Sequence, residues 1–274
     1  MPEQVGSTSG VSVIFEPEQG GRLTSLRGPH GREWLWRREL AEADRLAVRP
    51  GDPFIDAGGL EECCPTIAGA FDHGDIWSQP WSDEGNGNFA VTGHGYRLSR
   101  RISIVDGAIV ADYQLEAEEG VRFIWAGHAS LDLSEAAQII APEGHRTRVW
   151  PEHWQTWPNT EQLEGAWPAP IGDPHDRLRT DGTATFCMLL DLTSISARDG
   201  DAEIRFQLDA PGQPVAIALW RNLDAWPADA PYRSIAIEPA IGWHFDRDHV
   251  DPPEVGLVPA SGEVTWRLTI SATA

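Results

Sequence analysis

Lysine is absent from this chain of 274 residues, and all 21 basic residues are arginines. A Schiff base on an enzyme side chain needs a lysine amine, and a P-loop needs a lysine on the phosphates of its nucleotide. The sequence therefore excludes pyridoxal enzymes, Schiff-base aldolases and P-loop proteins.

Positive charge is scarce as well. The chain has 42 acidic residues against 21 basic ones, which is a formal net charge of −21. This charge repels phosphate backbones and anionic lipid surfaces, so neither nucleic acid nor a membrane is an expected partner. The first 20 residues lack both a basic start and an apolar run, and no apolar stretch of about 18 residues follows. These absences predict a cytoplasmic protein.

Cysteine is rare: Cys63 and Cys64 are adjacent, and Cys187 stands alone. Three cysteines in this arrangement make neither a disulfide framework nor a CxxC metal motif, which favours buried, reduced thiols. The histidines that could carry chemistry show no compact metal-binding spacing such as HxxxH. The sequence therefore predicts neither a metal nor another cofactor.

Tryptophan, by contrast, is abundant, with 13 residues in the chain. The indole supplies a flat apolar face with a donor edge, which suits the ring of a sugar. Residues 150–180 hold several of these rings together with prolines, and long loops are usually either functional or disordered. Two interpretations are open: the rings line a binding cleft, or they pin a long loop to a sheet.

Apolar residues alternate with polar or small ones over many short stretches, which is the period of a half-buried strand. Asp106 and Gly107 between two such stretches predict a two-residue hairpin turn, and Asp199 and Gly200 predict a second one. No stretch has the pattern of a convincing amphipathic helix, and no repeat of fixed period is present. The pattern predicts an all-β, antiparallel sandwich or barrel that forms one domain over residues 1–274.

Strand alternation places two polar residues on faces with little apolar bulk. In the stretch FIWAGHASLDL, His128 falls on the face opposite to Trp125. In YRSIAIEPA, Glu238 falls on the face opposite to Ile237, beside small side chains that leave room for a ligand. Each residue taken alone is also explained as a solvated polar residue on an outer sheet face.

Two further histidines lie beside glycines. His73 is flanked by Asp72 and Gly74, with tryptophans close behind, and histidine in this setting either belongs to a site or caps a turn. His94 lies between two glycines, which allow close approach either of a ligand or of a neighbouring strand. Both alternatives stay open for each residue.

Segments spread along the chain resemble those of the galactose mutarotase-like proteins, the aldose 1-epimerases and their relatives. The opening GGRLTSLRGPHGREWLW is similar to the first strands of the family. GGLEECCPTI with DHGDIWSQPW resembles a block in which an acidic-Cys/Met-x-Pro-Thr stretch precedes a His-Gly pair. HASLDL resembles the motif of the catalytic acid, and AIEP that of the catalytic glutamate. The order and spacing of these segments carry the resemblance.

This resemblance implies an antiparallel β-supersandwich that holds a sugar in an open cleft on a concave sheet face. It also implies that Glu238 is the general base on the anomeric hydroxyl, His128 the general acid to the ring oxygen, and His73 a second histidine near that oxygen. Further contacts with the sugar are expected from one acidic residue, one histidine and three tryptophans: Glu62, His94, Trp77, Trp81 and Trp154.

The chain departs from the family pattern at two positions near the acid. Leu131 stands where an aromatic residue is usual, and Gly127 stands where an asparagine often precedes the histidine. The acidic substrate-binding residue of the family also has no aligned motif here. The missing acidic residue leaves sugar specificity open, and divergence of the acid motif is also found in branches of the family that include sugar binders without turnover.

The first hypothesis is an aldose 1-epimerase (mutarotase)-like isomerase of carbohydrate metabolism, which interconverts the α and β anomers of a free sugar without a cofactor. The alternative is a non-catalytic carbohydrate-binding protein of the same fold. A glycoside hydrolase or lyase would need two carboxylates astride a bond, and no second carboxylate for Glu238 is evident. The expected partner under the first two hypotheses is a small-molecule carbohydrate.

Overall fold

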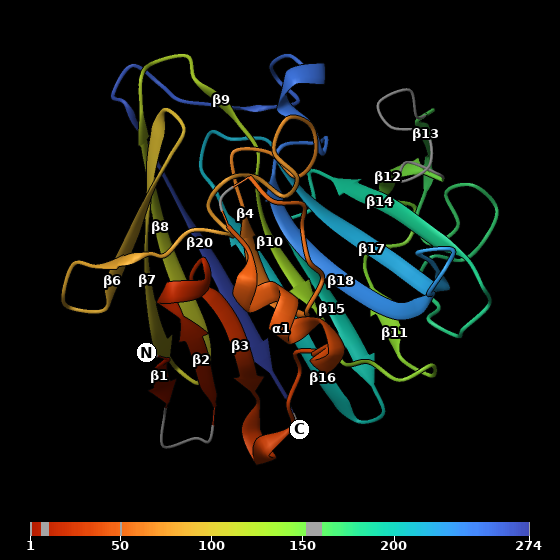
Figure 1. Ribbon diagram of the computed structural model, residues 1–274. Coiled ribbons are helices and arrows are strands. Elements are labelled where there is room, and N and C mark those ends of the chain that lie inside the picture. The colour runs from red at the N-terminus through yellow and green to blue at the C-terminus, as the bar shows by residue number, and fades with distance from the viewer. Residues whose placement is uncertain (1, 7–10, 50, 152–160, 274) are drawn as a thin grey trace.

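The computed structural model describes residues 2–6, 11–49, 51–151 and 161–273, which form two large antiparallel sheets (Figure 1). Within these residues, ten strands make the first sheet in the order β1 (Glu3–Gly6), β2 (Ser12–Glu16), β3 (Arg22–Arg27), β4 (Gly59–Cys63), β10 (Trp125–Ser130), β18 (Tyr232–Ile241), β17 (Val215–Trp226), β14 (Ala184–Leu190), β12 (Arg146–Trp150) and β13 (Leu163–Ala166). Eight make the second, in the order β11 (Gln138–Ile140), β15 (Ser194–Asp199), β16 (Ala202–Asp209), β20 (Glu263–Ala272), β8 (Ala108–Ala117), β7 (Tyr96–Val105), β6 (Asn88–Gly93) and β5 (Ser82–Asp83). A small separate sheet pairs β9 (Arg122–Phe123) with β19 (Gly256–Leu257).

Helical structure is limited to one α-helix, α1 (Glu39–Ala47), and three short 3-10 helices in the described residues, which are η1 (Pro17–Gln19), η2 (Pro29–Gly31) and η3 (Arg247–His249). The prediction that no amphipathic helix is present is wrong for α1. This helix has nine residues and buries only Ala41 and Arg45, so its apolar pattern is too short to stand out in the sequence. No helix of the described residues is both long and apolar enough to cross a membrane.

The two predicted hairpins are both present, one of them shifted. Val105 pairs with Ala108 across Asp106 and Gly107, whose φ angles are both positive, as a type I′ turn requires. In the second hairpin Asp199 itself pairs with Ala202, so the turn begins at Gly200, one residue later than predicted. Gly200 has φ of 64°, a conformation that glycine adopts without steric cost.

The main core lies between the two large sheets. Tyr113 of β8 stacks on Trp266 of β20 at 5.1 Å between ring centroids, and Trp125 of β10 meets Tyr113 at 4.9 Å. All three rings belong to one cluster of buried apolar residues that joins both sheets. Burying a large apolar side chain contributes about 1.5–3 kcal/mol. The predicted all-β, antiparallel sandwich is therefore confirmed, with its core where the alternation placed it.

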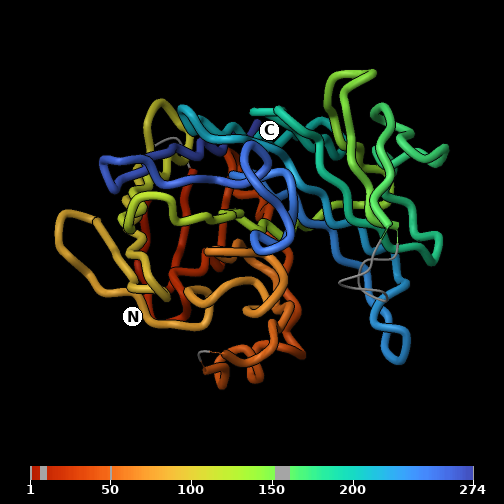
Figure 2. Tube along the Cα trace, turned by 90° about the horizontal axis from the view of Figure 1, so that it is seen from above, coloured from red at the N-terminus to blue at the C-terminus, as the bar shows by residue number. Residues whose placement is uncertain are grey.

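The other face of the ten-stranded sheet carries a second, smaller apolar cluster, with alanines at Ala126, Ala218 and Ala240 on three neighbouring strands. Small side chains keep this face shallow, which leaves space above it. Figures 1 and 2 show α1 and the loops before and after β4 packed over this face, on the side away from the second sheet. The three cysteines are free and buried, as predicted.

Candidate active site

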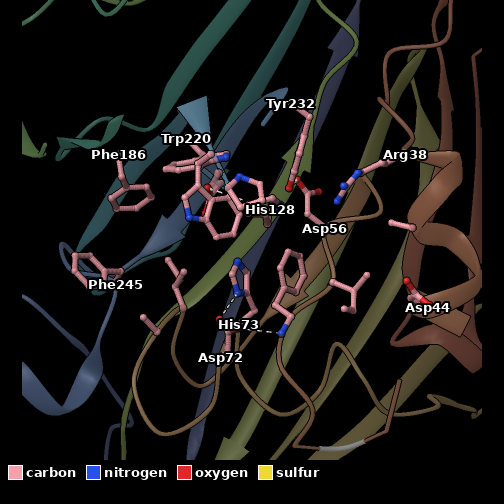
Figure 3. A pocket seen from close by; sticks show the side chains of 18 of the residues that line it. Arg38, Asp44, Asp56, Asp72, His73, His128, Phe186, Trp220, Tyr232 and Phe245 are labelled. Carbon is pink, nitrogen blue, oxygen red and sulfur yellow. Dashed lines mark hydrogen bonds and ion pairs between the residues drawn. The ribbon is translucent and has the colours of Figure 1, made fainter. Parts of the chain in front are cut away.

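A cavity of about 480 Å³ lies on this second face of the ten-stranded sheet, under α1 and the loops that flank β4 (Figure 3). This volume is within the range of roughly 300–1,000 Å³ that is typical of small-molecule sites. Its titratable lining residues are Arg38, Asp44, Asp56, Asp72, His73, His128, Tyr232 and Glu238. Its aromatic lining residues also include Phe54, Phe186, Trp220, Trp226 and Phe245.

His128 and Glu238 lie opposite each other on neighbouring strands of the cavity floor. The pairing of β10 with β18 sets Ala129 against Ile237, and the same register brings His128 against Glu238. Nε2 of His128 lies 3.7 Å from Oε1 of Glu238. Both side chains are buried, yet Nδ1 of His128 and Oε2 of Glu238 have no hydrogen-bond partner within the described residues. Buried polar atoms that lack partners beside a cavity indicate a place for a ligand.

The surroundings of Glu238 strengthen it as a base. Burial raises the pKa of Glu238 above its usual value; the charge of His128 opposes this rise, and the charge of Asp56 adds to it. A carboxylate with a raised pKa holds a proton more tightly than free glutamate does. Glu238 is therefore suited to take a proton from a hydroxyl group of a bound ligand.

His73 reaches the same cavity from the loop between β4 and β5. Its ring centroid lies 5.5 Å from that of His128, and its ring stacks on Phe54 at 3.6 Å and 11°. Nδ1 of His73 lies 2.8 Å from Oδ1 of Asp72. Burial alone would raise the pKa of Asp72. The hydrogen bond and the charge of His73 lower this pKa by more than burial raises it, so the net shift is downward. The three residues predicted as catalytic thus line one cavity.

Three polar residues at one end of the cavity carried no motif in the sequence. Oδ2 of Asp56 accepts hydrogen bonds from the hydroxyls of Tyr232, at 2.9 Å, and Ser234, at 3.1 Å. The guanidinium of Arg38 lies 4.1 Å from the centroid of the Tyr232 ring. For Arg38 and Asp56 the available signal was that residues 38–88 carry few strand patterns, and a long loop of this kind is often functional.

Glu62, a predicted sugar contact, lies on the opposite face of β4, inside the main core. Its carboxylate accepts hydrogen bonds from Arg100 Nη1 at 2.5 Å, from the Tyr113 hydroxyl at 2.8 Å and from the Trp125 indole at 2.8 Å. It is fully buried and is not among the described residues that line the cavity. The neighbouring Glu61 points to the opposite face of this strand, the face on which the cavity lies, because successive strand residues point to opposite faces.

Three of the other predicted sugar contacts, Trp77, Trp81 and His94, are not among the described residues that line the cavity. Trp77 is buried and donates its indole N–H to the backbone oxygen of Asp72, so it supports the loop that carries His73. Trp81 is buried in the main core. His94 is exposed. Trp154 lies outside the described residues.

A buried ion pair fixes α1 at the rim of the cavity. Glu61 pairs with His128 across β4 and β10, so it lies on the same face of the sheet as His128. Arg45 of α1 holds both oxygens of Glu61, with Nε at 2.8 Å and Nη2 at 2.9 Å, and also donates to the backbone oxygens of Gln19 and Trp77. This bidentate pair ties the helix to the strand next to the candidate acid.

The buried thiols of the described residues are not suited to act as nucleophiles. Burial raises the pKa of Cys63 well above its usual value, and that of Cys187 to about 12. Such thiols stay protonated and are poor nucleophiles. The described residues contain no group of three or more histidine, cysteine or acidic side chains that could hold a metal ion.

No protein-family model and no curated protein sequence matches this chain. Solved structures do match it along its whole length. The Slr1438 protein from Synechocystis sp. PCC 6803 matches at a TM-score of 0.72 and 11% identity, over 100% of this chain and 96% of that one. A galactose mutarotase related enzyme from Lactobacillus acidophilus matches at a TM-score of 0.68 and 13% identity, over 100% of this chain and 98% of that one. A galactose mutarotase-like protein from Lactobacillus casei matches at a TM-score of 0.67 and 14% identity, over 100% of both chains.

These matches confirm the predicted galactose mutarotase-like fold. At identities of 11–14%, these matches show a shared fold and not a shared function.

Proposed function

We propose that this protein is an aldose 1-epimerase-like enzyme that interconverts the α and β anomers of a free sugar. Glu238 acts as the general base, His128 as the general acid, and His73 is a second histidine near the ring oxygen. The observation that carries the proposal is the pair of His128 and Glu238 in the cavity floor, 3.7 Å apart, each with a buried polar atom that has no described partner. The names of the two mutarotase-like fold neighbours support the choice of reaction.

The proposed reaction moves two protons. The carboxylate of Glu238 takes the proton of the C1 hydroxyl, while protonated His128 gives one to the ring oxygen. The bond between C1 and the ring oxygen breaks, and the electron pair of the C1 oxygen forms the aldehyde. Rotation about the C1–C2 bond presents the other face of the aldehyde. The two proton transfers then run in reverse, the ring closes as the other anomer, and both residues regain their starting states.

The geometry of the pair suits this chemistry because both reacting oxygens of the sugar are bonded to the same carbon. An acid and a base that reach both oxygens can therefore lie close together. Neighbouring strands in register hold His128 and Glu238 in this way, without a flexible loop between them. Aromatic side chains of the lining, such as Trp220 and Phe186, offer flat faces to the apolar face of a sugar.

The proposal is tested by NMR exchange between the two anomers of a panel of aldoses, with and without the protein. We expect at least one sugar to exchange faster than its spontaneous rate in proportion to protein concentration. Heat-denatured protein at the same concentration is the control. Binding of sugars without faster exchange of any of them would favour the non-catalytic carbohydrate-binding protein and overturn the assignment of acid and base.

The catalysed rate is expected to fall in acid at an unusually high pH for a glutamate. Glu238 works only when ionised, and burial raises its pKa, so protons remove the base before the pH reaches the ordinary glutamate value of about 4.3. The measurement is kcat/KM for anomer exchange against pH, with the spontaneous rate subtracted and the fold checked by circular dichroism at each pH. An acid limb at or below about pH 4.3 would contradict a buried base.

A further inference from the structure

Asp72, a loop residue at the wall of the cavity, holds its neighbour His73 with one end of its carboxylate. One oxygen of its carboxylate, Oδ1, lies 2.8 Å from Nδ1 of His73. The other oxygen, Oδ2, accepts the backbone N–H of Phe54 at 2.9 Å. Figure 3 shows both bonds, with the His73 ring extending from Asp72 toward His128. A single carboxylate thus connects the imidazole to a second loop of the cavity wall.

Phe54 completes the hold on the ring. Its side chain stacks on the His73 imidazole at 3.6 Å and 11°, and it makes T-shaped contacts with the rings of Trp77 and His128. The backbone of His73 has φ of 60°, a region that non-glycine residues adopt only when surrounding contacts hold them there. The imidazole is therefore fixed on one face by a ring and on one edge by a carboxylate.

An ionised carboxylate accepts hydrogen bonds and donates none. The hydrogen bond and charge of His73 keep the pKa of Asp72 below its usual value although burial acts in the other direction, so the carboxylate is ionised at neutral pH. Nδ1 of His73 must then carry a hydrogen to make the bond. This leaves Nε2 as the nitrogen on the far side of the ring from Asp72.

We propose that Asp72 is a positioning residue that keeps a proton on Nδ1 of His73, so that Nε2 is the nitrogen that meets the sugar and gains or releases a proton there. Neutral histidine in water prefers the opposite tautomer, with its hydrogen on Nε2. The inference rests on the proposed function for its role in catalysis, but the tautomer itself is a property of the protein without sugar.

The test is the tautomer of His73, read from the ¹⁵N shifts of its ring in a long-range ¹H–¹⁵N spectrum at pH 9. The His73→Gln variant identifies the resonances. In the wild type we expect the hydrogen on Nδ1, and in Asp72→Ala on Nε2. Asp72→Asn, which keeps the shape, has only one accepting end and cannot accept both N–H groups, so it should also lose the preference. A wild-type hydrogen on Nε2, or no change in both variants, would overturn the proposal.

The kinetic consequence is tested with a matched control. Asp72→Asn is expected to lower kcat for anomer exchange by about 10²-fold, the scale of loss when a reacting group is misplaced, with KM changed little. Asp52→Ala removes a carboxylate that likewise accepts a backbone N–H, from Arg49 at 2.8 Å, but contacts no imidazole, and should leave kcat unchanged. A full kcat in Asp72→Asn would overturn the catalytic role. Absent exchange in the wild type would instead count against the epimerase proposal alone, because the tautomer is measured without sugar.

Discussion

Glu238→Gln is expected to lower the catalysed rate of anomer exchange by about 10²–10⁴-fold, the usual contribution of a general base, while the protein still binds its sugar. The amide has nearly the same shape as the carboxylate and cannot take a proton from the C1 hydroxyl. The measurement is NMR anomer exchange together with calorimetric titration of the same sugar. Glu263→Gln, an exposed residue on β20, is the matched control and should keep full activity.

The same substitution should leave the fold as stable at pH 7 or make it more stable. Burial raises the pKa of Glu238, which means that the folded protein disfavours the ionised carboxylate. The ionised carboxylate therefore lowers the free energy of unfolding. An uncharged amide avoids this cost. The gain is present above the folded-state pKa and is lost as the pH falls through it, since Glu238 is then neutral as well. An inactive Glu238→Gln with a large loss of stability would contradict a pure loss of the base.

Glu62→Ala is expected to lower the free energy of unfolding by about 3–5 kcal/mol, the scale of loss when one partner of a buried ion pair is removed. The substitution leaves the buried guanidinium of Arg100 without its carboxylate, and it leaves Tyr113 and Trp125 without the acceptor for their hydrogens. Urea denaturation measures the effect. Glu84→Ala removes an exposed ion pair with Arg97 and should cost at most about 1 kcal/mol.

This second experiment also separates two roles of Glu62. A structural residue of the core should leave sugar affinity and kcat unchanged at temperatures where the variant is folded. A loss of sugar affinity in a fully folded variant would instead support the prediction from the sequence that Glu62 contacts the sugar. A cost in unfolding free energy near that of Glu84→Ala would contradict the buried network.

Local sequence pattern was sufficient for the faces of the two central strands. Period-2 alternation placed Trp125 and Ile237 on one side and His128 and Glu238 on the other, and the structure has them so. Hairpin chemistry located both turns, the second with an error of one residue. These features are local, because steric preferences of a few neighbouring residues decide them.

Resemblance to the mutarotase-like proteins added what alternation alone left open. Either His128 or Glu238, taken singly, could have been a solvated residue on an outer face. The order of motifs along the chain suggested a common cleft with His73. The structure confirms the fold, and the three residues line one cavity.

Long-range pairing decided the rest. Glu61 and Glu62 are identical side chains on adjacent residues, but β4 directs Glu61 toward Arg45 of α1 and Glu62 into the main core. The charges that balance them, on Arg45 and Arg100, come from an unpredicted helix and a distant strand. Likewise Arg38, Asp56 and Tyr232 meet only because loops and strands far apart in the chain pack together. A partner's position depends on how whole elements pack, and this information is spread over the entire chain instead of residing in any one segment.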